Sequence, residues 1–366
     1  MKKSKSLHFV LVMLVIAAMV FVPSPTKAAK VILKDIDFEP PTSFSVIHSR
    51  YLWVQMVNEQ LRKAGYGDQY EIQYFPAEQL AKGADIYRAV RDGMAEIGYV
   101  AYSYVASLLP LYGVGDLPFL YKDHMRQLRL TQKLLANGLQ AYLESKGVHM
   151  VCPLSTFGYG VWTRNKPIKV MEDMKGLKIR TAGGISSEIM KKLGAVPVSL
   201  TTTEIYPAMM AGTIDGMSFD EMVGTSLKLH ETIKYVMRTP LHAVVGSSGI
   251  VMNLKAWNSL PKPVQAIFEL CGETSMRHAG DAVIYSGYQR VTEIYKKTGI
   301  TVTYLSPEEE QRWRKALMPI WDEWLAQHGN EFGGVGRKLW EIAKAHMENP
   351  NMEETGYEAG PNRWMK

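Results

Sequence analysis

The residue best placed to do chemistry in this chain is an arginine at the end of a predicted strand. The short apolar run at 177–179 ends in Arg180, and the pair Gly183-Gly184 then predicts a turn. A guanidinium at that position points into the space above the sheet, where its planar fork can hold a carboxylate at two points, which a lysine cannot reproduce. By spacing alone, a solvated arginine or a structural ion pair is the commoner role. We take Arg180 as a candidate anion-binding residue, and we expect its guanidinium to face solvent in the open, empty state of the protein.

The residues around this arginine, from Met174 to Phe219, predict a parallel α/β unit. The predicted elements are a strand at 177–179, a helix at 186–193, a strand at 198–200, a helix at 204–211 and a strand or turn from 214. Gly194 and Gly212 are placed to end the two helices, and Thr201 stands where an N-cap is expected. Ligands of such sheets bind at the carboxyl ends of the strands.

The amino-terminal half repeats the alternation of strand and helix. Strands are predicted at 31–38, 71–75 and 97–100, helices at 46–64, 85–91 and 123–146, and further strands at 148–154, 249–253 and 301–305. This order favours a mostly parallel sheet with helices on both faces. It places the loop from Glu39 to Thr42 and the segment from Ala101 to Tyr104 on one wall of a cleft.

Composition and charge limit the classes of protein to which this chain can belong. The chain has 366 residues, 46% of them apolar, so two domains are the natural expectation. Of the net charge of +6, four units come from Lys2, Lys3, Lys5 and Lys27, and +2 is left for the remainder. That balance does not suggest a nucleic-acid binder.

The first 28 residues have the pattern of a cleaved secretory signal. A lysine-bearing start precedes the apolar run from Phe9 to Val22, and Thr26-Lys27-Ala28 offers a cleavage site. The run is shorter than the roughly 20 residues that a membrane-spanning helix needs. We therefore expect residues 1–28 to be a signal peptide and the mature protein to be periplasmic.

Motifs of other chemistries are missing from the sequence. There is no GxSxG, HExxH or P-loop pattern to support an enzyme, and no spacing of histidine and cysteine resembles a zinc site. We predict no metal and no cofactor. Cys152 and Cys271 rule out a disulfide scaffold, and whether they pair stays open.

Several motifs resemble the solute-binding proteins of tripartite ATP-independent periplasmic (TRAP) transporters, of the DctP type. They are Met174 to Arg180, Leu193 to Leu200, Tyr206 to Gly216, Tyr74 to Leu80, Asp116 to Leu120 and Leu305 to Glu309. Together they span most of the mature chain in the family's order. The resemblance implies a two-lobed periplasmic-binding-protein fold in which each lobe is a mostly parallel sheet flanked by helices, with a long helix, about Lys262 to Thr298, spanning both. Lobe I is expected at 29–156 and 244–280, and lobe II at 157–243 and 281–366.

The same resemblance implies the function and the site. The protein is expected to be a monomeric receptor that binds an organic acid between its lobes and delivers it to the TRAP membrane subunits. Arg180 occupies the position of the family's carboxylate-binding arginine. Tyr159 stands where many relatives have a second arginine, with Arg164 a few residues late, so a monocarboxylate is favoured. The remaining predicted ligand-binding residues are Phe219, Tyr102, Asp220, His242 and Glu39.

Two other functions stay open at this point. A binding protein of similar fold could serve an ATP-driven transporter or a sensor kinase, and a secreted enzyme is the third alternative. The segments at 177–180 and 214–216 favour the TRAP family over the first of these, and the absence of catalytic motifs disfavours the second.

Overall fold

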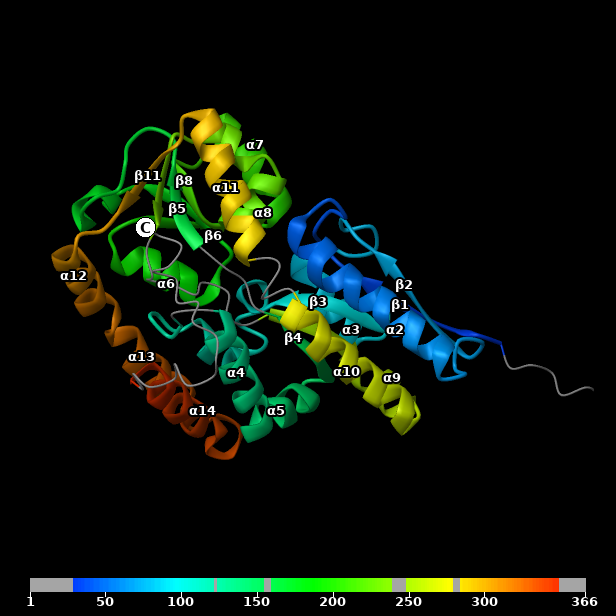
Figure 1. Ribbon diagram of the computed structural model, residues 1–366. Coiled ribbons are helices and arrows are strands. Elements are labelled where there is room, and N and C mark those ends of the chain that lie inside the picture. The colour runs from blue at the N-terminus through cyan, green and yellow to red at the C-terminus, as the bar shows by residue number, and fades with distance from the viewer. Residues whose placement is uncertain (1–28, 122–123, 155–158, 239–247, 279–283, 349–366) are drawn as a thin grey trace, which may run out of the picture.

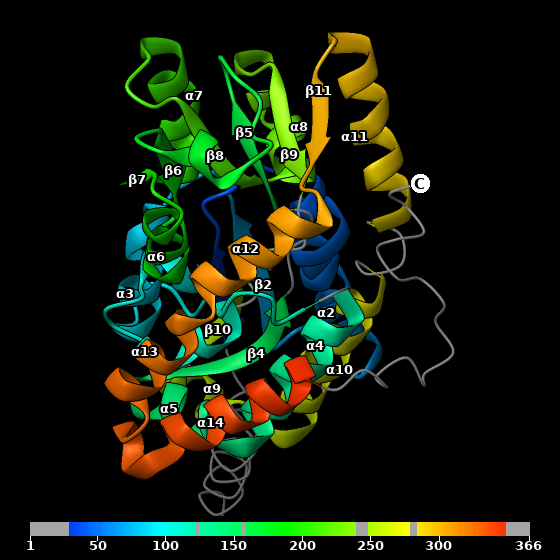
Figure 2. The same ribbon diagram turned by 90° about the vertical axis from the view of Figure 1, so that its left-hand side faces the viewer.

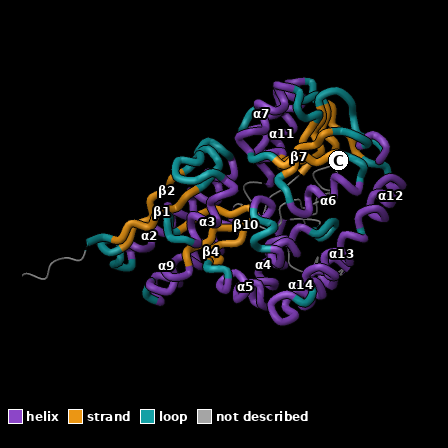
Figure 3. Tube along the Cα trace, turned by 180° about the vertical axis from the view of Figure 1, so that it is seen from behind, coloured by secondary structure: helices purple, strands orange, loops and turns teal. Residues whose placement is uncertain are grey.

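A computed structural model describes residues 29–121, 124–154, 159–238, 248–278 and 284–348. Within these ranges the strands form two separate sheets, each flanked by helices, as the two groups of orange strands in Figure 3 show. The predicted signal peptide at 1–28 and His242 lie outside the described residues.

The first sheet has the strand order β2-β1-β3-β10-β4. Its strands are β1 (Val31–Ile36), β2 (Tyr70–Phe75), β3 (Ile97–Ala101), β4 (Val148–Leu154) and β10 (Ser248–Asn253). Helix α10 (Lys262–His278) packs on α2 (Tyr51–Lys63) and on β4, while α3 (Ile86–Arg91) and α5 (Gln140–Ser145) contact β3 and β4 respectively. Short helices η1 (Val46–Arg50), η2 (Gly83–Asp85), η3 (Tyr102–Tyr104), η4 (Pro110–Asp116) and α9 (Leu254–Ser259) connect these elements.

The second sheet has the strand order β11-β9-β5-β8-β6-β7. Its strands are β5 (Tyr159–Thr163), β6 (Lys178–Thr181), β7 (Val196–Ser199), β8 (Gly216–Asp220), β9 (Tyr235–Arg238) and β11 (Thr301–Tyr304). Its helices are α6 (Gly184–Lys192), α7 (Thr202–Ala211), α8 (Glu221–Ser226), α11 (Ile284–Thr298) and the short η6 (Met171–Met174) and η7 (Leu229–Thr232). From β6 to β8 this is the strand and helix order predicted around Arg180, whereas β5 and β9 were not predicted from the sequence.

Each sheet is mixed and has one strand that runs antiparallel to its neighbours. β5 is antiparallel to β8 and β9, and β10 is antiparallel to β3 and β4, whereas the other neighbours pair in parallel. The prediction of two mostly parallel sheets is therefore confirmed.

Local sequence signals start and end the helices where expected. Glu204 accepts hydrogen bonds from the backbone N–H and the hydroxyl of Thr201, each at 2.7 Å, at the start of α7. Gly212 ends that helix in the left-handed conformation, with φ of 69°, which glycine adopts without a steric cost. Ser306 caps α12 (Pro307–Leu317) by accepting from the N–H of Glu309 at 3.2 Å.

The predicted long helix corresponds to α10 and α11, and residues 279–283 between them lie outside the described chain. α10 contacts α2 and β4 of the first sheet's layer, whereas α11 contacts α8 of the second. The two halves of the predicted helix thus lie in different parts of the molecule.

The carboxyl-terminal helices run from one sheet to the other, as the orange and red ribbons in Figures 1 and 2 show. α12 contacts α6, α13 (Pro319–His328) contacts η4, and α14 (Glu331–Glu348) contacts α4 (His124–Leu134) and η5 (Leu135–Leu139). α14 therefore packs on helices that we predict for lobe I, although the whole range 281–366 is predicted for lobe II. The lobe boundaries stay a prediction.

Large aromatic side chains fill the interior. Trp53, Trp162, Trp313 and Trp321 are among the largest fully buried side chains. Both cysteines are buried and unpaired, and burial raises the pKa of the Cys271 thiol to about 11. None of the described helices has the length and apolar character needed to cross a membrane.

A buried histidine on α14 predicts acid sensitivity. Burial, reinforced by Arg126 and Lys133, lowers the pKa of His346 from 6.5 to about 4. The folded state therefore disfavours the protonated ring, so stability that is complete above pH 6.5 is lost as the pH falls towards 4. We expect His346→Asn to lose less free energy of unfolding than the wild type across this window in urea titrations. His278→Asn, at an exposed position, is the control and should follow the wild type; equal acid loss in all three would contradict the assignment.

Candidate functional site

Arg180 lies where the two sheets meet. It is on β6, near the carboxyl end of the strand, and its side chain is only 1% exposed. Its Nε and Nη2 donate to the backbone oxygen of Leu200 at 2.9 and 2.7 Å, and Nη2 also donates to the hydroxyl of Tyr104 at 3.2 Å. In this arrangement η3 of the first sheet covers the end of β6, through Tyr104. The exposure of the guanidinium in the open, empty state stays a prediction.

The buried Arg180 forms no ion pair with a described carboxylate. Its charge does reach Glu204 on α7, whose carboxyl pKa is lowered chiefly by hydrogen bonds from Thr201 and further by Arg180. Two other largely buried arginines do form an ion pair: Arg238 pairs with Glu221 at 2.7 Å, and Arg50 pairs with Asp37 and Glu39. Removing an ion from water is costly unless an opposite charge compensates for it. An anionic group that is not part of the chain would supply that compensation at Arg180.

Aromatic rings of the second sheet surround the guanidinium. The carbon of the Arg180 guanidinium lies 5.0 Å from the ring centre of Phe219, a buried residue on β8. Tyr159 is paired with Asp220 in the sheet, and its ring centre is 6.3 Å from that of Phe219. Burial raises the pKa of Tyr159 well above its ordinary value; the carboxylate of Asp220 adds to the rise and Arg180 opposes it. The structure therefore gathers Arg180, Tyr159 and Phe219, as predicted from the sequence.

The first sheet contributes Tyr104 to this group. Its ring packs edge-on against Phe38, with ring centres 5.4 Å apart, and Phe38 stacks on Tyr99 at 5.2 Å. The hydroxyl of Tyr104 lies 3.0 Å from the hydroxyl of Thr202 on α7. These rings give the first-sheet side of the contact an apolar surface.

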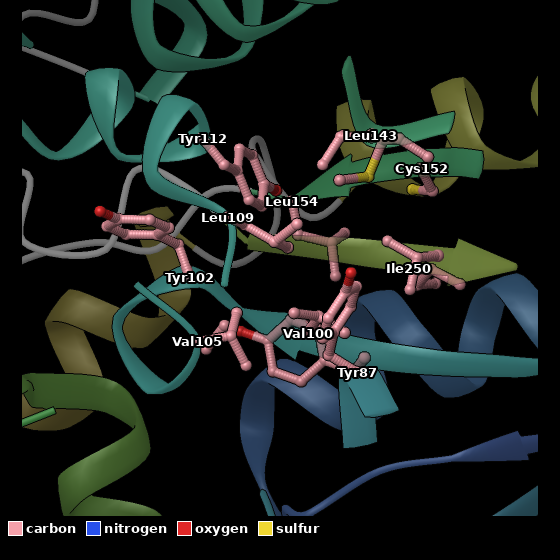
Figure 4. Close-up of a cluster of buried hydrophobic side chains, with 14 of the residues drawn as sticks. Tyr87, Val100, Tyr102, Val105, Leu109, Tyr112, Leu143, Cys152, Leu154 and Ile250 are labelled. Carbon is pink, nitrogen blue, oxygen red and sulfur yellow. The ribbon is translucent and has the colours of Figure 1, made fainter. Parts of the chain in front are cut away.

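Tyr102, the predicted site residue in this segment, lies elsewhere. It is buried with Tyr112 in the core of the first sheet, and Figure 4 shows the two rings near Leu109 and Val105. A Cβ atom added to Gly113 would lie 2.3 Å from the hydroxyl oxygen of Tyr102, so this hydroxyl is directed at the glycine. The structure thus brings Tyr104, two residues later, to Arg180 in place of Tyr102.

Glu39 belongs to a buried ionic cluster at the end of β1. Its Oε2 accepts from the hydroxyls of Ser43 at 2.6 Å and Ser45 at 2.7 Å, and lies 2.9 Å from Nη2 of Arg50. Asp37 accepts from Nε of Arg50 and from the hydroxyl of Tyr74. With all its oxygen contacts directed at its own loop and at Arg50, Glu39 holds the loop after β1, and no described contact joins it to Arg180.

Asp220 caps a helix. Its Oδ1 accepts from the N–H groups of Met222 and Val223 at 2.8 and 2.9 Å, at the first turn of α8. An aspartate just before a helix is a standard N-cap, and this signal was available in the sequence. A role of Asp220 in ligand binding would be additional to this capping role.

Arg164 is at the wrong end of β5 to be a second anion-binding residue. Tyr159 opens the strand beside Asp220, whereas the N–H of Arg164, beyond the other end, donates to the backbone oxygen of Asp215. Five residues of extended strand separate the two edges by roughly 16 Å. The described residues also hold no group of three or more His, Cys, Asp or Glu that could bind a metal ion.

The arrangement can bind an anion but offers little for catalysis. A buried cation, a hydroxyl from the opposite sheet and a set of aromatic rings meet between two separate layers. Such a site suits a carboxylate attached to an apolar body, because the rings provide packing and the cation provides charge.

Comparison with known proteins agrees with this geometry. Residues 45–328 match the family described as bacterial extracellular solute-binding protein, family 7, or DctP. The C4-dicarboxylate-binding periplasmic protein DctP of Rhodobacter capsulatus is 27% identical over 272 residues, which are 71% of this chain and 78% of that protein.

Solved structures share the fold. A TRAP solute-binding protein from Rhodoferax ferrireducens in complex with copurified benzoate aligns with a TM-score of 0.73 and 23% identity, over 87% of this chain and 98% of that one. A TRAP periplasmic solute-binding protein from Sulfurospirillum deleyianum with bound succinate aligns with a TM-score of 0.71 and 21% identity, over 87% and 99%.

Proposed function

Because this chain belongs to bacterial extracellular solute-binding protein family 7, the DctP family of TRAP solute-binding proteins, we propose that it is the receptor for a monocarboxylate with an apolar or aromatic body. Proteins of this family bind solutes and are not enzymes. The receptor acts in the periplasm, after removal of residues 1–28. It closes its lobes on the acid and delivers it to the TRAP membrane subunits.

One observation carries the proposal. Arg180 is 1% exposed and forms no ion pair with a described carboxylate. Arg50, which is 3% exposed, and the partly buried Arg238 are each paired with a carboxylate. A ligand carboxylate is the anion that would balance Arg180, because a guanidinium and a carboxylate are matched in charge and shape.

The preference for one carboxylate rests on Tyr159. The family resemblance places it near the point where many relatives with dicarboxylate or sialic-acid ligands have a second arginine, and Arg164 lies beyond the far end of the same strand. The surrounding rings of Phe219 and Phe38 favour packing over a second charge. The relatives with known ligands include one with benzoate and one with succinate, so both classes occur in this fold.

A thermal-shift screen of carboxylates tests the ligand class. Benzoate and other monocarboxylates are expected to raise the melting temperature more than succinate or malate at equal concentration. A ligand present at a hundred times its Kd adds about 2.7 kcal/mol to the free energy of unfolding. Benzamide, which has the same ring without the charge, is the control and should give no shift. A larger shift with succinate than with every monocarboxylate would contradict the proposal.

A further inference from the structure

The donors of Arg180 are unevenly occupied. A guanidinium has five N–H donors. Nε and one hydrogen of Nη2 are directed at the backbone oxygen of Leu200, at 2.9 and 2.7 Å, and Nη2 also reaches the hydroxyl of Tyr104. Among the described residues nothing accepts a hydrogen bond from Nη1. The arginine therefore does not offer a free two-point fork, and Nη1 is the part left for a ligand.

Tyr104 stands beside that free edge and belongs to the opposite sheet. Its ring is fixed by Phe38 and by close packing at Gly83, where an added Cβ would lie 3.3 Å from the tyrosine ring. Its oxygen accepts from Arg180 and lies 3.0 Å from Oγ1 of Thr202. A hydroxyl has two acceptor sites and one proton. When Arg180 and Thr202 both donate to it, the proton of Tyr104 is available to a further acceptor.

We propose that Tyr104 is a ligand-binding residue that shares the carboxylate with Arg180. One carboxylate oxygen accepts from Nη1 of Arg180, and the other accepts the hydroxyl proton of Tyr104. Two-point recognition is then divided between β6 of the second sheet and η3 of the first. This inference rests on the proposed function and adds a residue that neither the family resemblance nor the sequence pattern assigns.

Sharing the carboxylate between the two sheets would link ligand binding to closure of the lobes. Nη1 and the hydroxyl are close together only when the two layers are in contact, as they are here through the bond from Arg180 to Tyr104. A carboxylate that needs both donors therefore stabilises the closed arrangement over an open one. A ligand without a carboxylate would gain neither bond.

Calorimetric titration of benzoate into the wild type, Tyr104→Phe, Tyr206→Phe and Arg180→Lys tests the inference. Tyr104→Phe keeps the packing on Phe38 and loses one hydrogen bond to a charged group, so Kd should rise about 10- to 100-fold. Tyr206→Phe removes a hydroxyl from an exposed position on α7 and should bind as the wild type does. Melting temperatures without benzoate show that each variant is folded.

The outcomes separate this inference from the function it rests on. If Tyr104→Phe binds benzoate within threefold of the wild type while Arg180→Lys does not bind, Tyr104 is not a ligand residue and the carboxylate site at Arg180 stands. Tighter binding by Tyr104→Phe would overturn the inference by showing that the hydroxyl competes with the carboxylate. If the wild type binds no benzoate at millimolar concentration, the proposal of an aromatic monocarboxylate falls and this inference falls with it.

Discussion

Arg180→Lys is expected to abolish most carboxylate binding and to lower the stability of the empty protein. In a site that excludes water, breaking one side of a charge pair costs roughly 3–5 kcal/mol, which is about two to three and a half decades in Kd. A lysine keeps the charge, but a single ammonium on a flexible stem cannot serve the Leu200 oxygen and a ligand together. Calorimetry with benzoate measures the first effect.

The loss of stability is a second, independent result of the same change. Because the guanidinium is buried and donates twice to the backbone of Leu200, the variant should lose about 1.5–3 kcal/mol of unfolding free energy without ligand. Arg164→Lys, at the far end of β5, is the matched control and should change neither quantity. Affinity of Arg180→Lys within threefold of the wild type would mean that Arg180 is structural and that the site lies elsewhere.

Arg50→Ala is expected to give the largest loss of stability. Arg50 is 3% exposed and is the described cation that faces Asp37 and Glu39, with Asp35 buried nearby. Burial already raises the pKa of Asp35 well above its ordinary value, Asp37 raises it further, and Arg50 opposes the rise. Without the arginine the carboxylates are buried and uncompensated, so we expect a loss of roughly 3–5 kcal/mol in urea unfolding at pH 7.

Two further variants calibrate that result. Arg277→Ala breaks an exposed pair with Glu273, whose side chains are 68% and 47% exposed, and should cost no more than about 0.5 kcal/mol. Arg50→Lys keeps the positive charge and should retain part of the stability. A loss below about 1 kcal/mol for Arg50→Ala would show that the cluster carries little net energy.

Local signals in the sequence predicted the part of the second sheet from β6 to β8 well, whereas β5 and β9 were not predicted. Each of the signals used here lies within a few residues of the element it predicts, so no knowledge of distant contacts was needed. The signals are the glycines that end α6 and α7, the polar start of α7 and the apolar runs of β6 and β8. Arg180 was found for the same reason, since its position at a strand end depends only on its neighbours in sequence.

What the sequence could not predict depends on contacts between distant segments. Tyr102 and Tyr104 are equally aromatic and close in sequence, and only the turn of η3 decides that Tyr104 reaches Arg180, 76 positions away. The burial of Arg180 follows from the same contact. Similarly, Glu39 is an acidic residue in a loop after a strand, which favours a role in ligand binding. Its pairing with Arg50, at the start of α2, depends on the fold and could not be predicted from the sequence.

A crystal structure of the protein with the monocarboxylate that gives the largest thermal shift would show whether the ligand binds at Arg180. We expect the acid between the two sheets, with one carboxylate oxygen about 2.7–2.9 Å from a guanidinium nitrogen of Arg180 and the body of the acid against Phe219. A ligand bound at any other place, or bound here with its carboxylate turned away from Arg180, would contradict it.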